Sequence, residues 1–178
     1  MADRPRGGRF TISRVDPCTP NPTRRLAVAH APFELLYGAG SLWVSTSGGR
    51  AITRIDDRTG RTIAHIRVPE GGDALHSTFI AGALWVTGLH VWRIAAATNR
   101  ARRAGIRRPD IAFDVSASAS RLWLRRTGGR AAAVDPKHMH EEATYPADPT
   151  TDGPLLAAFG SLWVVNFDAD TVWQDRLD

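Results

Sequence analysis

Short apolar runs alternate with turns rich in glycine and aspartate along most of the chain. In residues 33–69, "FELLY" and "SLWVST" are apolar runs joined by "GAG", whereas "AITRID" and "TIAHIRV" alternate between apolar and polar residues. Alternation with a period of two, bounded by turn residues, is typical of strands, and helices need longer uninterrupted periodic segments. This unit therefore predicts four short strands that form a meander.

One apolar phrase recurs four times. "GSLWV" begins at Gly40 and returns at Gly160, and the related phrases "GALWV" and "SRLWL" begin at Gly82 and Ser120. The four tryptophans of this phrase are separated by 42, 38 and 40 residues. A period of about 40 to 45 residues is typical of a β-propeller with four strands in each blade. The predicted fold class is therefore all-β, a propeller with about four four-stranded antiparallel blades.

The repeated strand has no polar interruption, as expected for a middle strand that is buried on both faces between two neighbouring blades. Successive strand residues point to opposite faces. Leu42 and Val44 are therefore predicted to face one neighbouring blade, and Trp43 the other. This pattern favours a packing role for the four tryptophans over a ligand-stacking role.

The repeats also predict the domain organisation. Residues 1–9 are predicted to be a flexible basic tail, and residues 10–178 a single propeller domain. The predicted units are a half-blade at 10–29, blades at 33–69, 74–108 and 111–145, and a half-blade at 153–177. "DTVWQD" at 170–175 is a surplus copy of the third strand, in which Asp175 takes a position that is apolar in the other copies, so either this copy is frayed or the chain is cut from a longer propeller.

The two half-blades leave three assemblies open. The terminal strands can pair within one chain and close a four-bladed monomer, which removes two exposed sheet edges. Two chains can instead form an eight-bladed ring, or the chain can be an open fragment of a larger propeller. The predicted state is accordingly a monomer or a homodimer.

Composition narrows the function classes. The 178 residues carry a net charge of +5, almost wholly from arginine, and this charge specifies no particular polyanion. The single cysteine, Cys18, excludes an internal disulfide and a cysteine-based zinc site. No apolar run approaches the roughly 20 residues that span a membrane. "MADRPRGGRF" lacks the apolar core of a secretory signal, so a cytoplasmic location is expected unless the parent sequence is longer.

The pattern "GSLWV…ITRIDDRTGRTIAHIRV" resembles the bacterial propeller repeats of the YVTN and NHL type, including streptogramin lyase-like propellers. The resemblance is carried by the Gly-x-Leu-Trp-Val phrase, by Arg54 to Asp56 and by Thr59-Gly60, and it covers about residues 10–175. It implies the propeller architecture more strongly than any activity. Similar proteins include carbohydrate or peptide binders and a metal-dependent lyase that opens a cyclic depsipeptide antibiotic. The lyase's Trp-Phe-Thr-Glu extension is missing here, and its catalytic histidine and glutamate residues have no counterparts that can be assigned.

Polar residues gather in the loops that are predicted to meet at one mouth of the channel. These loops join strand four to the next strand one and strand two to strand three. Their candidate ligand-binding residues are His30, Arg50, His76, His90, Asp110, Arg130, Asp152 and Asp168, with Asp73 and Asp170 nearby. Together they can bind an anion, a sugar or a divalent ion. The alternative is that they are ordinary solvated loop residues.

Two further clusters lie in hairpins. "DPKHMHEE" places His138 and His140 two residues apart, which predicts a weak zinc or nickel site at the end opposite the channel mouth. "NRARRAGIRR" at 99–108 packs five arginines into one hairpin, but it lacks the exposed aromatic groove of a nucleic-acid site, so nucleic-acid binding is not expected.

The predicted function is a non-enzymatic binding or interaction scaffold that presents loops around a propeller channel to an unknown small molecule or protein. No catalytic residue and no cofactor is assigned, and a divalent metal is the one cofactor alternative. A metal-assisted lyase or hydrolase of the streptogramin lyase type is the second hypothesis. A fragment of a longer propeller without activity of its own is the third.

Overall fold

The computed structural model describes residues 10–19, 22–28, 31–46, 50–69, 76–106, 112–118, 120–146 and 153–177. Within these ranges the chain forms strands joined by turns, and no helix. The predicted tail at residues 1–9 lies outside them. No helix in this part of the chain could cross a membrane.

The strands form five antiparallel sheets in chain order. The first has two strands, β1 (Phe10–Val15) and β2 (Pro22–Val28). Three four-stranded sheets follow, in which each strand pairs with the next. They are β3 (Pro32–Gly38), β4 (Ser41–Thr46), β5 (Ala51–Asp56) and β6 (Thr62–Arg67); β7 (His76–Ile80), β8 (Ala83–Thr87), β9 (Val91–Ala95) and β10 (Arg100–Arg103); and β11 (Ala112–Ser118), β12 (Arg121–Arg126), β13 (Arg130–Asp135) and β14 (His140–Pro146). The last has three, β15 (Leu155–Ala158), β16 (Ser161–Asn166) and β17 (Thr171–Arg176).

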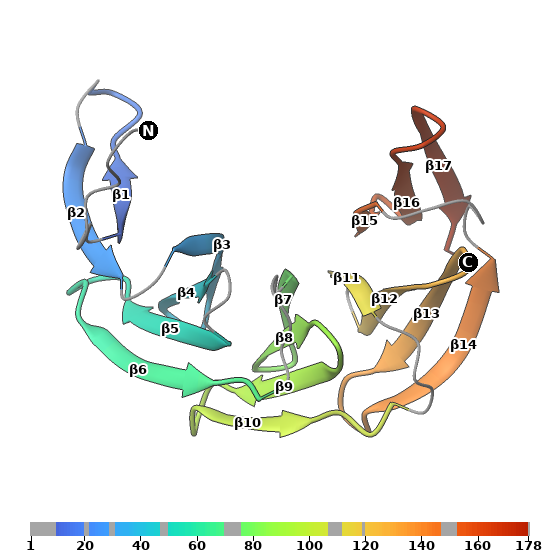
Figure 1. The fold of residues 1–178 in the computed structure, drawn as a ribbon, viewed down its shortest axis with the longest axis horizontal. Coiled ribbons are helices and arrows are strands. Elements are labelled where there is room, and N and C mark those ends of the chain that lie inside the picture. The colour runs from blue at the N-terminus through green and yellow to red at the C-terminus, as the bar shows by residue number, and fades with distance from the viewer. Residues whose placement is uncertain are drawn as a thin grey trace, which may run out of the picture.

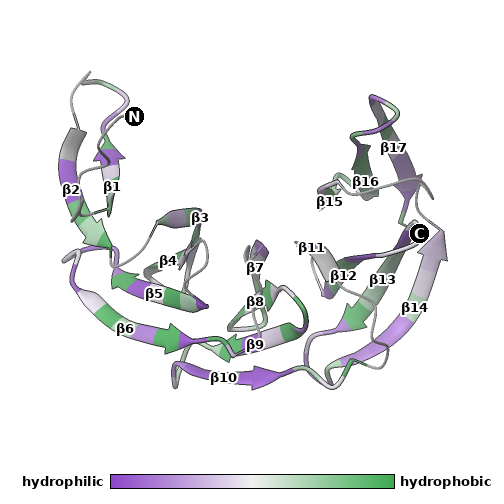
Figure 2. Ribbon diagram, in the orientation of Figure 1, coloured by the Kyte–Doolittle hydropathy of each residue, from purple (hydrophilic) through white to green (hydrophobic). Residues whose placement is uncertain are grey.

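The five sheets stand side by side in an open arc (Figure 1). The first strand of each later sheet, namely β3, β7, β11 and β15, lines the concave side, and β6, β10 and β14 follow the convex side. Figure 2 shows that the convex strand β10 is mostly hydrophilic. This order of strands, from the inside of an arc to its outside, is that of propeller blades, so the predicted all-β propeller architecture is observed.

The repeated tryptophans lie between neighbouring sheets. Trp43 packs with Leu84 and Val86 of β8, so it faces the following sheet, whereas Val44 packs with Val28 of β2 on the preceding side. The same arrangement places Trp85 against Leu122 and Leu124 of β12, and Trp123 against Leu162 and Val164 of β16. The alternation that the sequence predicted for Leu42, Trp43 and Val44 is therefore confirmed.

The inner hairpins use a turn in which two successive residues take positive φ angles. The pairs are Ala39 and Gly40 (φ 48° and 63°), Ala81 and Gly82 (51° and 68°), and Phe159 and Gly160 (53° and 67°). Two central residues with positive φ define the type I′ turn, whose twist matches that of the flanking strands. The "TGGR" turn behaves as predicted too, since Gly128 and Gly129 have φ angles of 70° and 67°.

The two ends of the arc do not join. β1–β2 and β15–β17 belong to separate sheets, and Figure 1 shows them on opposite sides of a wide opening. Pairing of the terminal strands into a closed four-bladed monomer, one of the three predicted assemblies, is therefore not the arrangement observed. Of the two alternatives for 170–175, the frayed copy is not observed: β17 pairs with β16 from Ser161–Arg176 to Asn166–Thr171, and Val172 and Trp173 give it the pattern of a third strand.

Candidate functional site

Polar side chains from three neighbouring sheets meet on the concave side, at the start of the inner strands. Glu34 belongs to β3, His76 and Ser77 to β7, and Asp114 to β11. The Ser77 hydroxyl donates a hydrogen bond to Glu34 Oε2 at 2.5 Å. The His76 Nδ1 atom lies 3.7 Å from Asp114 Oδ1. We call Glu34, His76, Ser77 and Asp114 the inner-strand cluster.

Burial changes the acidity of both carboxyl groups in this cluster. Loss of solvent raises the pKa of Glu34 above its ordinary value, against the lowering effects of the Ser77 hydrogen bond and of His76. Burial likewise raises the pKa of Asp114, which is opposed by hydrogen bonds from backbone N–H groups and by His76. Two partly desolvated carboxyl groups beside an imidazole are suited to bind a cationic or proton-donating group.

Part of the cluster is also structural. Asp114 Oδ2 accepts the Leu155 N–H at 2.7 Å, and Ser116 Oγ accepts the Ala157 N–H at 3.1 Å. Both bonds run from β11 to β15, the inner strand of the next sheet. The polar residues of the inner strands therefore also attach neighbouring sheets to one another.

The arrangement does not make a hydrolase triad from Ser77, His76 and Asp114. Consecutive strand residues point to opposite faces, and the Ser77 hydroxyl is engaged with Glu34 rather than with the His76 ring. A nucleophilic serine needs its hydroxyl within hydrogen-bond reach of the base. The geometry thus favours binding over acyl transfer at this cluster.

Of the predicted channel-mouth residues that the structure describes, His76 lies in this cluster. His76 contacts Asp114 and packs edge-on against Phe33, with ring centroids 5.3 Å apart. His90 lines a different small hollow of about 30 Å³, with Arg103 and Arg126. His76 belongs to the inner-strand cluster and His90 lines this hollow, and the grouping of the channel histidines stays a prediction.

The other predicted mouth residues are exposed or undescribed. Arg50, Arg130 and Asp168 are exposed to solvent, and Asp170 follows Asp168 in the same exposed turn. His30, Asp73, Asp110 and Asp152 lie outside the described residues. Glu34 and Asp114 were missed by the sequence interpretation. A signal existed, because each acidic residue interrupts an otherwise apolar or small-residue inner strand, "FELLY" and "AFDVSAS".

A larger hollow lies between the first two sheets. Its volume is about 390 Å³. It is lined by Ile12, Ser13, Arg14, Arg24, Leu26, Leu35, Leu42 and Asp57. It exists because the first sheet contains only two strands, so it leaves the inner part of the next sheet uncovered: Leu35 is 52% exposed and Tyr37 60%.

The predicted metal residues lie in the turn between β13 and β14. The His138 Nδ1 atom is 2.5 Å from Asp135 Oδ2, and one ligand atom from each of Asp135, His138 and His140 lies within 4.8 Å of the others. The hydrogen bond with His138, together with backbone N–H donors, lowers the pKa of Asp135 to about 2. Sequence alone did not include Asp135 in this group.

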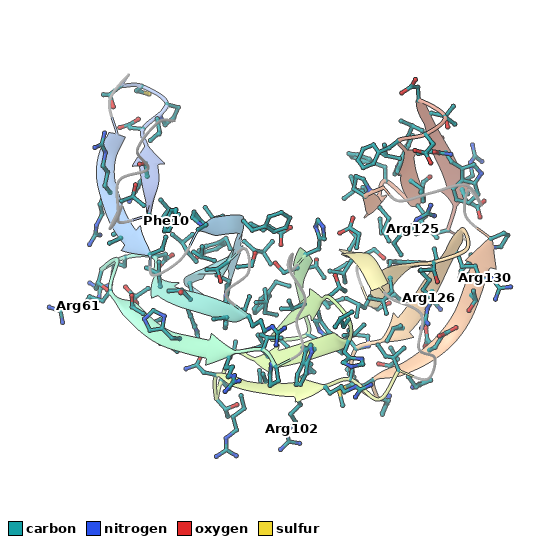
Figure 3. All side chains as sticks on the ribbon, viewed as in Figure 1. Phe10, Arg61, Arg102, Arg125, Arg126 and Arg130 are labelled. Carbon is teal, nitrogen blue, oxygen red and sulfur yellow. The ribbon has the colours of Figure 1, made fainter. Side chains whose placement is uncertain are left out.

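Arginines divide into two environments (Figure 3). Arg61 and Arg102 project away from the convex side into solvent, whereas Arg125 and Arg126 lie among packed sheets. Arg126 Nη2 donates to Glu141 Oε2 at 2.7 Å in an ion pair whose Arg126 side chain is 4% exposed and whose Glu141 side chain is 20% exposed. The arginine-rich β10 hairpin is thus a solvated outer edge, as its sequence suggested.

Solved structures of low sequence identity share this fold. Hsv2 from Kluyveromyces marxianus matches with a TM-score of 0.73 at 13% identity, over 97% of this chain and 55% of that chain. The computationally designed protein Ika4 matches with a TM-score of 0.69 at 11% identity, over 84% of this chain and 92% of that chain. The designed protein Ika8 matches with a TM-score of 0.64 at 11% identity, over 80% of this chain and 44% of that chain.

Hsv2 and the two designed proteins are β-propellers, so this chain has the fold of a partial β-propeller. The chain spans about half the length of Hsv2 and of Ika8. No protein-family model matches it, and no curated protein matches it in sequence. These likenesses carry the fold and no activity.

Proposed function

We propose that the chain is a non-enzymatic binding scaffold whose concave side receives a positively charged group of a partner molecule. The observation that carries this proposal is the inner-strand cluster, in which two carboxyl groups from different sheets lie beside an imidazole. The chain as a whole is basic, with a net charge of +5. A local acidic cluster on a basic protein selects for a cation and against an anion.

The half-exposed Phe33 ring supports the same ligand class. It stands beside His76 at the edge of the cluster. An aromatic face next to carboxyl groups is suited to an alkylammonium or guanidinium group, through cation–π attraction. The ligand class proposed is therefore the side chain of a lysine or an arginine.

A titration with N-acetyl-arginine amide and N-acetyl-lysine amide, followed by NMR of the His76 ring, tests this proposal. Saturable shifts are expected, with about tenfold weaker affinity in Glu34→Gln, which keeps a hydrogen-bond acceptor for Ser77 but removes the charge. Glu142→Gln is the matched control, because Glu142 is paired with Arg121 on the outer part of a sheet. Equal binding of N-acetyl-aspartate amide, or unchanged affinity in Glu34→Gln, would contradict the proposal.

A second proposal concerns assembly, and the open arc favours it. Apolar side chains are exposed at both ends: Leu35 and Tyr37 at the first, and Leu156 (55%), Phe159 (95%) and Val172 (64%) at the last. We infer that a second copy completes the ring, with the last sheet of one chain against the first two sheets of the other. The match to Ika8, over 44% of that longer chain, supports a half-ring. The Gly-x-Leu-Trp-Val phrase supports a relation to YVTN and NHL-type repeats.

Light scattering in dilute solution tests the assembly. A mass of twice the 19.4 kDa chain is expected, and Leu156→Asp should return it to a single chain. Leu89→Asp is the matched control, since Leu89 is 52% exposed in the turn between β8 and β9, in the middle sheet of the five. A single-chain mass at all concentrations would rule out this assembly.

A further inference from the structure

Three outer hairpins of this fold, β1–β2, β5–β6 and β13–β14, share one capping bond with the β16–β17 turn of the last sheet. In each of four hairpins an aspartate or asparagine at the end of the first strand accepts a backbone N–H of the turn through its Oδ1 atom. The pairs are Asp16 with Cys18, Asp56 with Thr59, Asp135 with Lys137, and Asn166 with Asp168. This capping bond orients the carboxylate, and it leaves the Oδ2 oxygen of each aspartate available for another contact.

The β13–β14 and β5–β6 hairpins have the same capping bond, but they differ in the residues that follow the capping aspartate. Asp56 is followed by Thr59-Gly60-Arg61, whereas Asp135 is followed at the same spacing by His138-Met139-His140. The threonine hydroxyl donates to Asp56 Oδ1 at 2.6 Å. The imidazole that replaces it lies 2.5 Å from Asp135 Oδ2. The repeat therefore keeps the turn and places two imidazoles beside a carboxylate that is already oriented.

Met139 fixes the position of the two histidines. It takes the left-handed conformation (φ 56°) that Gly60 has in the β5–β6 turn, and its N–H donates to the Asp135 carbonyl at 2.9 Å. Its side chain packs against the core between the second and third four-stranded sheets. A large residue held in this way anchors the turn between its two histidines, although glycine would fit the backbone more easily.

We propose that Asp135, His138 and His140 form a binding site for a divalent transition metal such as Zn²⁺. Two imidazoles and one carboxylate match the ligands that zinc and nickel prefer, and they do not match the all-oxygen sites of calcium or magnesium. The ligand atoms already lie within 4.8 Å of one another, and zinc bonds of about 2.0 to 2.2 Å require them to approach to about 3.3 Å. Both histidines are exposed, so their rings are free of packing constraints on this movement.

Access to the site is open. Asp135 and His138 line a hollow of about 460 Å³ together with Arg121, Lys137 and the turn residues Ile80 and Ala81 of the preceding sheet. A metal held by three protein ligands would keep a fourth position for water on this side. The site lies at the end of β13, away from the inner-strand cluster, so it goes beyond the proposed binding function and does not depend on it.

Isothermal titration of the untagged full chain with ZnCl₂, and separately with NiCl₂, tests this site. We expect one equivalent to bind with a micromolar dissociation constant. The double variant His138→Ala/His140→Ala should abolish binding. Asp135→Asn should weaken it at least tenfold while the turn persists, because Asn166 makes the same capping bond in the β16–β17 turn.

Two controls separate this site from other metal-binding groups. His65→Ala should leave the affinity unchanged, since His65 is an exposed histidine on β6 that contacts Thr53. Cys18→Ser should also leave it unchanged, because the exposed thiol is the competing soft ligand. Loss of binding in either control, with retention in the double histidine variant, would overturn the assignment.

A gain-of-function variant provides an independent test. Thr59→His/Arg61→His copies the two imidazoles onto the Asp56 turn, so it should add a second equivalent of zinc. Absence of zinc or nickel binding by the wild-type chain at 100-fold excess over the protein at about 10 µM would overturn the proposal outright.

Discussion

Trp85 and Trp163 occupy the same position of the same repeated phrase, yet their surroundings differ. Trp85 is completely buried, because the β11–β14 sheet covers the face of β8 on which it lies. Trp163 is half-buried on β16, in the last sheet of the arc, where no following sheet is present among the described residues. Leu162 and Val164, on the other face of the same strand, are fully buried against the preceding sheet.

This difference shows that the repeated strand carries apolar residues on both faces, which suits a neighbouring sheet on each side. The burial of its side chains depends on whether both neighbouring sheets are present. The local hairpin is retained at either place: Trp163 Nε1 still donates to the carbonyl of Ala158, as Trp43 does to that of Gly38. A repeat protein therefore keeps its local structure at an end of the array and leaves its apolar surface without cover. An uncovered aromatic surface of this kind is suited to an interface.

The largest expected effect is on the free energy of unfolding after truncation of the two tryptophans. Trp85→Ala should lower it by about 3 to 5 kcal/mol, because a large cavity opens between two sheets. In the single chain Trp163→Ala should lower it by about 1 kcal/mol, since less of its surface is removed from water, whereas in the proposed two-chain ring the loss should approach that of Trp85→Ala. Urea unfolding followed by circular dichroism measures both. Equal losses would mean that the last sheet is covered in solution.

A second expected difference concerns two ion pairs of the β11–β14 sheet. Arg126→Met should cost about 2 kcal/mol, because it leaves Glu141 charged in a partly buried position. Arg121→Met should cost less than about 1 kcal/mol, because the Arg121–Glu142 pair is exposed. Adding Glu141→Gln to Arg126→Met should recover most of the loss. If it does not, the guanidinium acts mainly through packing.

Trp43 and Trp85 offer a finer comparison, since both are buried. Trp43 Nε1 donates to the Gly38 carbonyl at 2.9 Å and its ring lies under Arg54. Trp85 Nε1 has no hydrogen-bond partner among the described residues. Trp43→Phe should therefore cost about 1 kcal/mol more than Trp85→Phe in thermal or urea unfolding. The opposite order would show that ring size, and not the hydrogen bond, determines the cost.

The smallest expected effect depends on pH. Burial raises the folded-state pKa of Glu34 above its unfolded value, so the folded protein holds that proton more tightly. Its contribution to stability is present at low pH and is lost as the pH rises through the folded-state pKa. Glu34→Gln should therefore be more stable relative to the wild type at pH 7 than at pH 4. A pH-independent difference between the two melting temperatures would contradict this prediction.

The sequence predicted the strands and the faces of Leu42, Trp43 and Val44 because these depend on local alternation and on a repeated neighbour. It did not predict whether the ends join, because that depends on contacts between residues separated by nearly the whole chain. The site was predicted less well. His76 was recognised as a polar residue in a loop. Its partners Glu34 and Asp114 come from other sheets, and the signal for them in the sequence was that each interrupts an apolar or small-residue strand.

Asp135, which caps the turn that carries His138 and His140, was likewise missed as a candidate metal ligand. Asp135 recurs as Asp16 and Asp56 in two other outer hairpins, which marks it as a structural residue, and its second oxygen becomes relevant only when His138 is placed beside it. Spacing alone identified the two histidines. Their orientation toward one carboxylate oxygen depends on the conformation of Met139, which the sequence does not disclose.

Each sheet packs only on its immediate neighbours. The sheets at the two ends of the arc should therefore unfold more readily than the sheets in the middle. Backbone amides of β1–β2 and β15–β17 are expected to exchange with deuterium fastest, and those of β8 and β9 slowest, in a gradient that follows position in the row and not sequence composition. Joining the two ends would flatten this gradient, which makes exchange kinetics a direct reading of whether the ring is complete.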